Sequence, residues 1–383
     1  MLAAIAAAGV ASGIAQASGR ASYSRYAGFP GHQKAGLMRH RRRRVRNASQ
    51  AAPLVFGIYP GGAAGTVGPA GTTSPENPAK RLAALQQLRA PGRPFVLHLY
   101  AGYTGPGGWS ADAQVGDEIR QYASAGFQVE LALTYRPSDG GSAADVTGFT
   151  NFVRDTVRAF GPIPQFVSLQ VTNEANIGGA PNASDGYYTG AEDALIQGII
   201  AAKDELRADG FPQVKVGFSW AYDTRSSESA FWSYLGHHGG RAFLDALDWV
   251  GLDAYPGTWG PPLPGNGLAD GVSSAITDAL HTLRSTYLPL AGISGQVPLH
   301  VCENGYPTGP HRTEAMQVTV LRAAVNTVQR ERAQFNVTDY RWFDLRDADS
   351  SSSSFESQYG LLRDDYSPKP AFDVYRQLIA DLS

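Results

Sequence analysis

The chain has 383 residues, of which 43% are hydrophobic and 17% are charged, and its formal net charge is -2. This length and composition allow one large buried core, and the nearly balanced charge gives no electrostatic reason to expect a nucleic-acid partner. The single cysteine, Cys302, excludes an intramolecular disulfide and a cysteine-cluster metal site.

Residues 1–50 differ in composition from the rest of the chain. An alanine-rich apolar segment, 2–15, runs into an Ala-Gln-Ala sequence at 15–17 that resembles a signal-peptidase site, although no basic residues precede it. Residues 39–46 are basic without interleaved aromatics, which is typical of a solvated tail. Two interpretations stay open: a secretion signal followed by a disordered linker, or a translation start at Met38. The apolar segment is too short to span a bilayer comfortably, so we expect no membrane span and lean towards secretion.

From Pro53 onward one pattern repeats: a short apolar strand, a loop rich in Gly, Pro, Asp and Tyr, and an amphipathic helix. Gly210 is a typical C-cap for the fourth helix, and a glycine pair at 239–240 interrupts the fifth. In chain order, the expected strands are 54–59, 95–100, 129–135, 167–172, 214–220, 249–254, 299–302 and 339–345. The expected helices are 78–88, 112–125, 144–160, 191–209, the region around 239–240, 269–288, 313–333 and 371–382.

Eight strand–helix units predict an α/β fold, a (β/α)8 (TIM) barrel. Strands that are separated by helices cross over and run parallel. A doubly wound sheet is the alternative, but residues 59–62, Tyr-Pro-Gly-Gly, do not form a glycine-rich phosphate fingerprint after the first strand. We therefore expect a single barrel domain over 51–383, preceded by a disordered extension over 1–50.

Two of the expected strands deliver a carboxylate to their carboxyl ends. The fourth leads to Glu174, and the seventh ends at Glu303, directly before the turn residues Asn304-Gly305. The carboxyl ends of barrel strands share one crater, and these two strands lie on opposite sides of it. A lone strand-end glutamate is usually a cap or an ion-pair partner, but a facing pair among aromatic residues suits glycoside hydrolysis, which needs one protonated and one ionised carboxyl group.

These motifs resemble those of clan A glycoside hydrolases. Asn173-Glu174 stands where that clan has its acid/base, and Glu303 stands where it has its nucleophile. The triplet 303–305 is similar to the nucleophile motif of family 1 β-glycosidases, and the segment 359–371 resembles families 5 and 39. The likeness covers most of residues 53–383 and leaves the family unresolved.

The resemblance implies a retaining O-glycoside hydrolase that cleaves a β-linked oligo- or polysaccharide by double displacement, without a cofactor or a metal. Glu174 would be the acid/base, Glu303 the nucleophile, and Asn173 would bind the sugar 2-hydroxyl. Tyr255 would orient Glu303, and Trp342 would form the floor of the subsite where cleavage occurs. Other substrate contacts are expected near the strand ends, from Tyr59, His98, Tyr135, Trp220, Asp253 and Trp259.

The chain also departs from the family patterns. Family 5 enzymes usually have an arginine near the end of the second strand and a histidine near the third, where this chain has His98 and Tyr100, then Tyr135 and Arg136. Family 1 enzymes have proline after the fourth-strand glutamate, and this chain has Ala175. The sugar, the linkage and the choice between exo and endo action therefore stay open.

Other functions fit the same residues. A transglycosylase would use the same glutamates with a sugar acceptor in place of water, and a catalytically silent carbohydrate-binding barrel would not need both. A metal-dependent hydrolase is disfavoured because His237-His238 lacks the usual H-x-H spacing. Glu130 lies inside the third strand, so we expect it to be structural, and we assign Asp253 and Asp344 to the polar wall. The expected partner is a carbohydrate, and the expected state is a monomer.

Overall fold

The computed structural model describes residues 52–62, 74–106, 113–137, 143–180, 182–260, 263–264 and 267–383. The signal-like segment and the basic run that we identified in residues 1–50 lie outside these described residues. The barrel is described here by itself.

Eight parallel strands close into a barrel in the order in which they occur in the chain, which confirms the predicted fold class. The barrel closes where β8 pairs with β1, from Val55 opposite Asp339 to Ile58 opposite Trp342. The strands are β1 (Val55–Ile58), β2 (Phe95–Tyr103), β3 (Gln128–Tyr135), β4 (Phe166–Val171), β5 (Lys215–Ala221), β6 (Trp249–Asp253), β7 (Leu299–Asn304) and β8 (Val337–Trp342).

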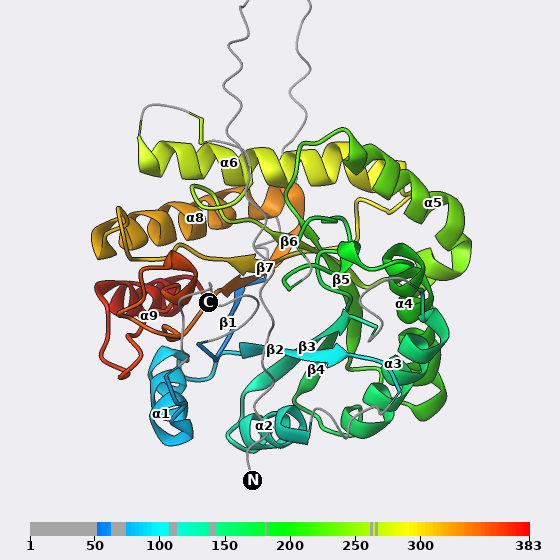
Figure 1. The fold of residues 1–383 in the computed structure, drawn as a ribbon, viewed down its shortest axis with the longest axis horizontal. Coiled ribbons are helices and arrows are strands. Elements are labelled where there is room, and N and C mark those ends of the chain that lie inside the picture. Colours follow the sequence, from blue (N-terminus) through cyan, green and yellow to red (C-terminus); the bar gives the residue numbers. More distant parts are fainter. Residues whose placement is uncertain are drawn as a thin grey trace, which may run out of the picture. The chain divides into compact units, whose positions relative to one another are not determined.

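Helices surround the strands (Figure 1). Asn77 and Thr313 cap α1 and α8 by accepting a backbone N–H with their side chains, and α5 kinks at Gly240, where φ is 56°. None of the described helices is both long and apolar enough to cross a lipid bilayer. The helices are α1 (Pro78–Leu88), α2 (Ala113–Ser124), α3 (Val146–Phe160), α4 (Ala191–Asp209), α5 (Ser227–Ala246), α6 (Leu268–Thr282), α7 (Leu288–Leu290), α8 (Glu314–Phe335) and α9 (Pro370–Leu382), with the short 3-10 helices η2 (Asp185–Tyr187) and η4 (Phe355–Ser357) and the π-helix η3 (Leu283–Tyr287).

Side chains of each strand alternate between the helix layer and the barrel interior. Residues on the outer face are apolar and pack on helices: Trp220 of β5 lies 6.0 Å from Trp232 of α5, and Trp342 of β8 lies 6.5 Å from Tyr375 of α9, measured between ring centroids. This face supplies most of the core, because it is sealed between strands and helices.

The barrel interior is ionic rather than apolar near its centre. Glu130 is fully buried, with one carboxylate oxygen 2.9 Å from His98 Nδ1 and 3.5 Å from Arg341 Nε. Burial acts to raise the pKa of Glu130, but Arg341 and His98 outweigh it and hold that pKa below its usual range. Glu130 therefore has the structural role that its position inside the strand predicts.

Candidate active site

A cavity of about 940 Å³ opens at the carboxyl ends of the strands. This is a typical size for a small-molecule site. Its wall combines aromatic rings with carboxyl groups and two arginines. The residues that line it include Tyr59, Tyr100, Arg136, Asn173, Glu174, Asp223, Arg225, Asp253, Tyr255, Trp259, Glu303, Phe343, Glu356 and Tyr359.

Glu303 is held by two tyrosine hydroxyls. β7 carries it to the cavity, where it is 7% exposed. The Tyr100 hydroxyl donates a hydrogen bond to Glu303 Oε1, and the Tyr255 hydroxyl donates to Oε2 over 2.6 Å. Burial and the charge of Glu303 raise the pKa of both tyrosines well above the usual value, so both hydroxyls keep their protons and remain donors. The carboxylate is therefore fixed in orientation from both sides.

Glu174 leaves β4 through a backbone in an unusual conformation. Thr172 and Glu174 have φ values of 64° and 48°, in the left-handed region that residues with a side chain avoid unless the surrounding structure enforces it. The Glu174 amide donates to Ser219 Oγ over 3.3 Å, and the Ser184 hydroxyl donates to Glu174 Oε2. Burial and the charge of Glu303, partly opposed by Ser184, raise the pKa of Glu174 to about 8. This carboxyl group therefore holds a proton at neutral pH.

A third carboxyl group completes the centre of the cavity. Asp253 is the residue of β6 that pairs with Glu303 of β7. One oxygen from each of Glu174, Asp253 and Glu303 lies within 4.8 Å of the others. Burial, then the charges of Glu303 and Glu174, raise the pKa of Asp253 well above its usual value. The two glutamates that the sequence places 129 positions apart thus meet in one cavity.

The same three carboxyl groups form the cluster of potential metal ligands among the described residues. Carboxylate oxygens suit hard cations such as Ca²⁺. However, hydroxyl groups already donate to both oxygens of Glu303 and to one oxygen of Glu174. This arrangement fits hydrogen-bonded carboxyl groups better than a metal centre.

Asn173 is fixed by the loop that follows β4. Its amide N–H donates to Asp185 Oδ2 over 2.8 Å, its side-chain Nδ2 donates to the carbonyl of Ala183 over 2.9 Å, and its Oδ1 accepts from Gln170 Nε2 over 3.2 Å. Arg136 at the end of β3 reaches the same loop, with its Nε 3.7 Å from Asp185 Oδ1. Because Asn173 Nδ2 has a second N–H, the residue can still donate to a bound sugar.

Aromatic side chains form the rest of the wall. Tyr59 stacks on Phe343, with ring centroids 5.3 Å apart and an interplanar angle of 13°. At the rim, Trp259 is 51% exposed, and its indole N–H donates to the Tyr359 hydroxyl over 2.8 Å. Flat apolar surfaces held in this way match the C–H faces of sugar rings.

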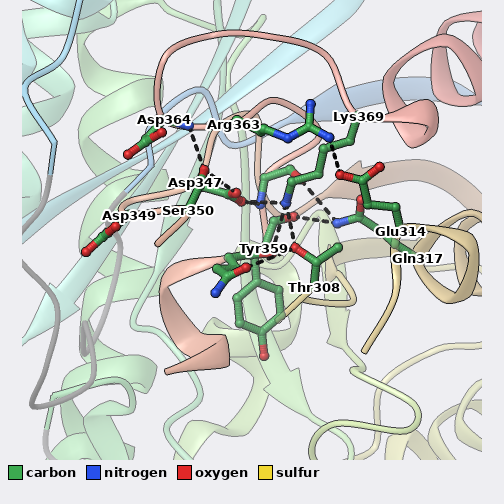
Figure 2. A network of polar contacts seen from close by, with 12 residues as sticks. Thr308, Glu314, Gln317, Asp347, Asp349, Ser350, Tyr359, Arg363, Asp364 and Lys369 are labelled. Atoms are coloured by element: carbon green, nitrogen blue, oxygen red, sulfur yellow. Dashed lines mark hydrogen bonds and ion pairs between the residues drawn. The ribbon is translucent and has the colours of Figure 1, made fainter. Parts of the chain in front are cut away.

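A buried polar network supports the segment that carries Tyr359 (Figure 2). Lys369 Nζ donates to Asp347 Oδ1 over 2.7 Å and to Thr308 Oγ1 over 2.9 Å. Gln317 Nε2 of α8 donates to the carbonyl of Tyr359 over 3.2 Å. The Tyr359 ring extends away from this network, so the network anchors the backbone of Tyr359 while its ring lines the cavity.

Three residues that we expected at the substrate lie elsewhere. Trp342, Trp220 and Tyr135 are all fully buried, and none of them lines the cavity. All three lie on the outer face of their strands, where Tyr135, for example, packs edge-on against Phe149 of α3. The aromatic residue that reaches the cavity here is Phe343, directly after the end of β8 at Trp342, because successive side chains point to opposite faces.

His98 also lies away from the substrate. It points into the barrel, but it lies deeper than the cavity and bonds to Glu130. The residue that reaches the cavity from the same face of β2 is Tyr100, two positions later, and the sequence analysis gave it no role. The contribution of Ser184 was also missed, because it comes from a long glycine-rich loop, and the sequence of such a loop does not indicate which side chains face the cavity. Of the other expected contacts, Tyr59, Asn173, Asp253, Tyr255 and Trp259 do line the cavity.

No family model and no curated protein matches the chain. Solved structures nevertheless share its architecture. A β-glucosidase from Exiguobacterium marinum aligns over 86% of this chain and 98% of its own, with a TM-score of 0.56 and 13% identity. The chain has the fold of glycoside hydrolase barrels. A family 39 glycoside hydrolase from Bacteroides cellulosilyticus WH2 aligns over 86% of this chain and 64% of its own (TM-score 0.54, 15% identity). A family 17 β-1,3-glucanosyltransferase from Rhizomucor miehei aligns over 84% of this chain and 97% of its own (TM-score 0.50, 16% identity). At these identities the likeness establishes the fold alone.

Proposed function

We propose that the chain is a retaining O-glycoside hydrolase that acts on β-linked oligo- or polysaccharides, with Glu174 as acid/base and Glu303 as nucleophile. The observation that carries the proposal is the spacing of the pair, whose nearest oxygens lie within 4.8 Å of each other inside the cavity. Carboxyl groups about 5–5.5 Å apart are typical of retaining enzymes, whereas inverting enzymes need about 6.5–9.5 Å to admit a water molecule between them. The glycoside hydrolase fold and the aromatic wall support the same conclusion.

In the first step, Glu303 attacks the anomeric carbon while Glu174 gives its proton to the departing oxygen. The raised pKa of Glu174 suits this step because its carboxyl group is protonated at neutral pH. Tyr100 and Tyr255 aim the two oxygens of Glu303, which limits the motion needed to reach the anomeric carbon. The product of this step is a covalent glycosyl-enzyme ester on Glu303.

In the second step, Glu174 takes a proton from a water molecule, which then attacks the anomeric carbon and releases Glu303. The negative charge on Glu303 disappears when the ester forms, so the repulsion that raises the pKa of Glu174 falls and Glu174 becomes a competent base. Two displacements at the same carbon leave its configuration unchanged.

Product stereochemistry and azide rescue test this proposal together. With an aryl β-glycoside, NMR should show the β-anomer as the first product. Glu303→Ala should lose turnover, and added azide should then yield the α-glycosyl azide, because azide replaces the missing nucleophile on its own face. Glu174→Ala should retain activity on dinitrophenyl glycosides, whose leaving group needs no proton, and should give the β-glycosyl azide. An α-anomer as first product would contradict retention.

Two alternatives are separated by simple measurements. A transglycosylase would transfer the sugar from Glu303 to an added sugar acceptor in preference to water, which product analysis at increasing acceptor concentration detects. A silent carbohydrate-binding barrel would bind sugars but turn over none of a broad panel of aryl glycosides. The raised pKa of Glu174 beside a carboxylate held by two tyrosines favours catalysis over silent binding.

A further inference from the structure

Asp253 is the one of the three central carboxyl groups that the mechanism above does not use. It is 2% exposed and lines the cavity, and neither of its oxygens meets the geometry of a hydrogen bond with a described residue; Ser219 is the polar neighbour that partly opposes the rise in its pKa. Buried carboxyl groups in proteins are almost always paired or hydrogen-bonded. Asp253 is therefore arranged for a partner that enters the cavity.

The charges around the cavity indicate what kind of partner fits. Arg136 and Arg225 are the cationic side chains among the described residues that line it. Arg225 is paired with Asp223, and Arg136 lies beside Asp185. In the described part of the chain the three central carboxyl groups therefore form no ion pair with a cationic side chain, although Arg136 lies near enough to oppose the rise in the pKa of Glu174. The charge of Glu303 raises the pKa values of Glu174 and Asp253, and a positively charged group on the ligand would offset that charge.

The spacing of the three carboxyl groups suits an ammonium group. Because one oxygen from each group lies within 4.8 Å of the others, a nitrogen placed between them can lie within about 2.8 Å (4.8 Å divided by √3) of all three oxygens. This is the usual length of an N⁺–H···O⁻ hydrogen bond, and an ammonium group has three N–H bonds to donate. Calcium prefers six to eight oxygen ligands, and Glu174 and Glu303 already accept hydrogen bonds from hydroxyl groups, so three carboxyl groups serve it less well.

The position of Asp253 also indicates where on the sugar the ammonium group lies. In the proposed mechanism Glu303 bonds to the anomeric carbon, and Asp253 is its neighbour across the β6–β7 pairing. The ring position next to the anomeric carbon that can carry a substituent nitrogen is C2. Resting on the proposed glycosidase function, we propose that Asp253 selects substrates whose reacting sugar carries a free amino group at C2, that is, 2-amino-2-deoxy-β-glycosides.

Matched pairs of 4-nitrophenyl β-glycosides test this inference. Each pair, in the gluco, galacto and manno configurations, differs only in a hydroxyl or an ammonium group at C2, and the assays run at about pH 6, where such amines are protonated. In at least one configuration the wild-type kcat/KM for the amine should exceed that for the hydroxyl by about tenfold or more. Asp253→Asn should reduce this ratio by about tenfold, because it removes one charge-assisted hydrogen bond.

The control is Glu356→Gln, which removes a different carboxylate from the cavity wall. It should leave the amine-to-hydroxyl ratio within about twofold of wild type, since it changes the general field but no direct contact. A wild type that prefers the hydroxyl in every pair, or an Asp253→Asn variant that lowers both members of a pair equally, would overturn the inference while leaving the glycosidase proposal standing.

The binding of amino sugars tests the role of Asp253 independently of turnover. Calorimetric titration should show that glucosamine, galactosamine or mannosamine binds wild type at least about tenfold more tightly than the parent sugar, and that Asp253→Asn abolishes this difference. Equal binding, or no binding of either, contradicts the inference. If no glycoside is turned over yet the amino-sugar preference is present, the glycosidase proposal fails and the binding site stands. If the Asp253→Asn variant does not fold, the amine-to-hydroxyl ratios of kcat/KM and of affinity in the wild type alone test the inference.

Discussion

The hydroxyl of Tyr255, which follows β6, donates a 2.6 Å hydrogen bond to Oε2 of Glu303 on β7. Tyr255 is partly buried, and its raised pKa keeps the hydroxyl protonated beside the carboxylate. Since the Tyr100 hydroxyl donates to the other oxygen, the Glu303 side chain cannot change its rotamer without losing a charge-assisted hydrogen bond. The nucleophile that we propose is therefore oriented before any substrate binds.

Replacing Tyr255 by Phe should lower kcat/KM for a neutral aryl glycoside by about 10–150-fold. A hydrogen bond to a charged group contributes about 1.5–3 kcal/mol, and its loss also frees the carboxylate to rotate. Steady-state kinetics measures the effect. The control is Tyr122→Phe, another buried tyrosine, whose hydroxyl has no hydrogen-bond partner among the described residues; its kinetics should match wild type. Equal rates for Tyr255→Phe and wild type would rule out the orienting role.

The fall in kcat/KM at alkaline pH, the alkaline limb of the pH profile, should reflect the loss of the proton from Glu174. Its pKa of about 8 predicts that kcat/KM for a neutral glycoside with a poor leaving group falls as pH rises through about 8, because the acid loses its proton. The Ser184 hydroxyl donates to the Glu174 carboxylate and so lowers this pKa. Ser184→Ala should therefore move the limb to higher pH, by about half a unit to one unit.

Rates measured between pH 5 and 10 check this shift. Ser124→Ala is the matched control, because within the described part of the chain the Ser124 hydroxyl donates to the carbonyl of Gln121 on an exposed helix surface, far from the carboxyl groups of the cavity. Its limb should coincide with that of wild type. A limb that moves to lower pH in Ser184→Ala would mean that Ser184 does not stabilise the ionised form of Glu174.

The barrel itself was predictable because its signals are local. Eight apolar runs alternate with amphipathic stretches, and several helix ends carry a recognisable residue, such as Gly210, whose φ of 77° needs a glycine. Glu174 and Glu303 could also be located, since a carboxylate next to turn residues marks the end of a strand. Neither prediction required knowledge of contacts between distant parts of the chain.

The wall of the cavity was less predictable, for two physical reasons. The first is that side chains alternate between the two faces of a strand. An error of one residue therefore assigns the outward-facing Trp342 to the cavity in place of the inward-facing Phe343. The second is depth: His98 and Tyr100 share one face of β2, yet only Tyr100 reaches the cavity. Ser184, which comes from an irregular loop, carries no periodic signal at all.

The buried pair of Lys369 and Asp347 should be important for stability. Both side chains are almost completely buried, with Nζ and Oδ1 2.7 Å apart. Lys369→Met should lower the free energy of unfolding by about 3–5 kcal/mol, because it leaves Asp347 as an uncompensated buried charge. Denaturant unfolding measures the change. The exposed pair of Arg241 and Asp245 is the control, and Arg241→Met should cost less than about 0.5 kcal/mol. A loss below about 1 kcal/mol in Lys369→Met would show that Asp347 finds another partner.

Trp259 should matter for long substrates more than for short ones. It lies at the rim of the cavity, half exposed, and its orientation is fixed by the hydrogen bond to Tyr359. An aromatic contact of this kind contributes about 0.5–1.5 kcal/mol, so Trp259→Ala should raise KM for oligosaccharides by about 2–12-fold while leaving a short aryl glycoside nearly unchanged. Tyr187→Ala is the control, because Tyr187 is similarly exposed but does not line the cavity. Equal KM changes for long and short substrates would place Trp259 beside the reacting sugar rather than beside the rest of the chain.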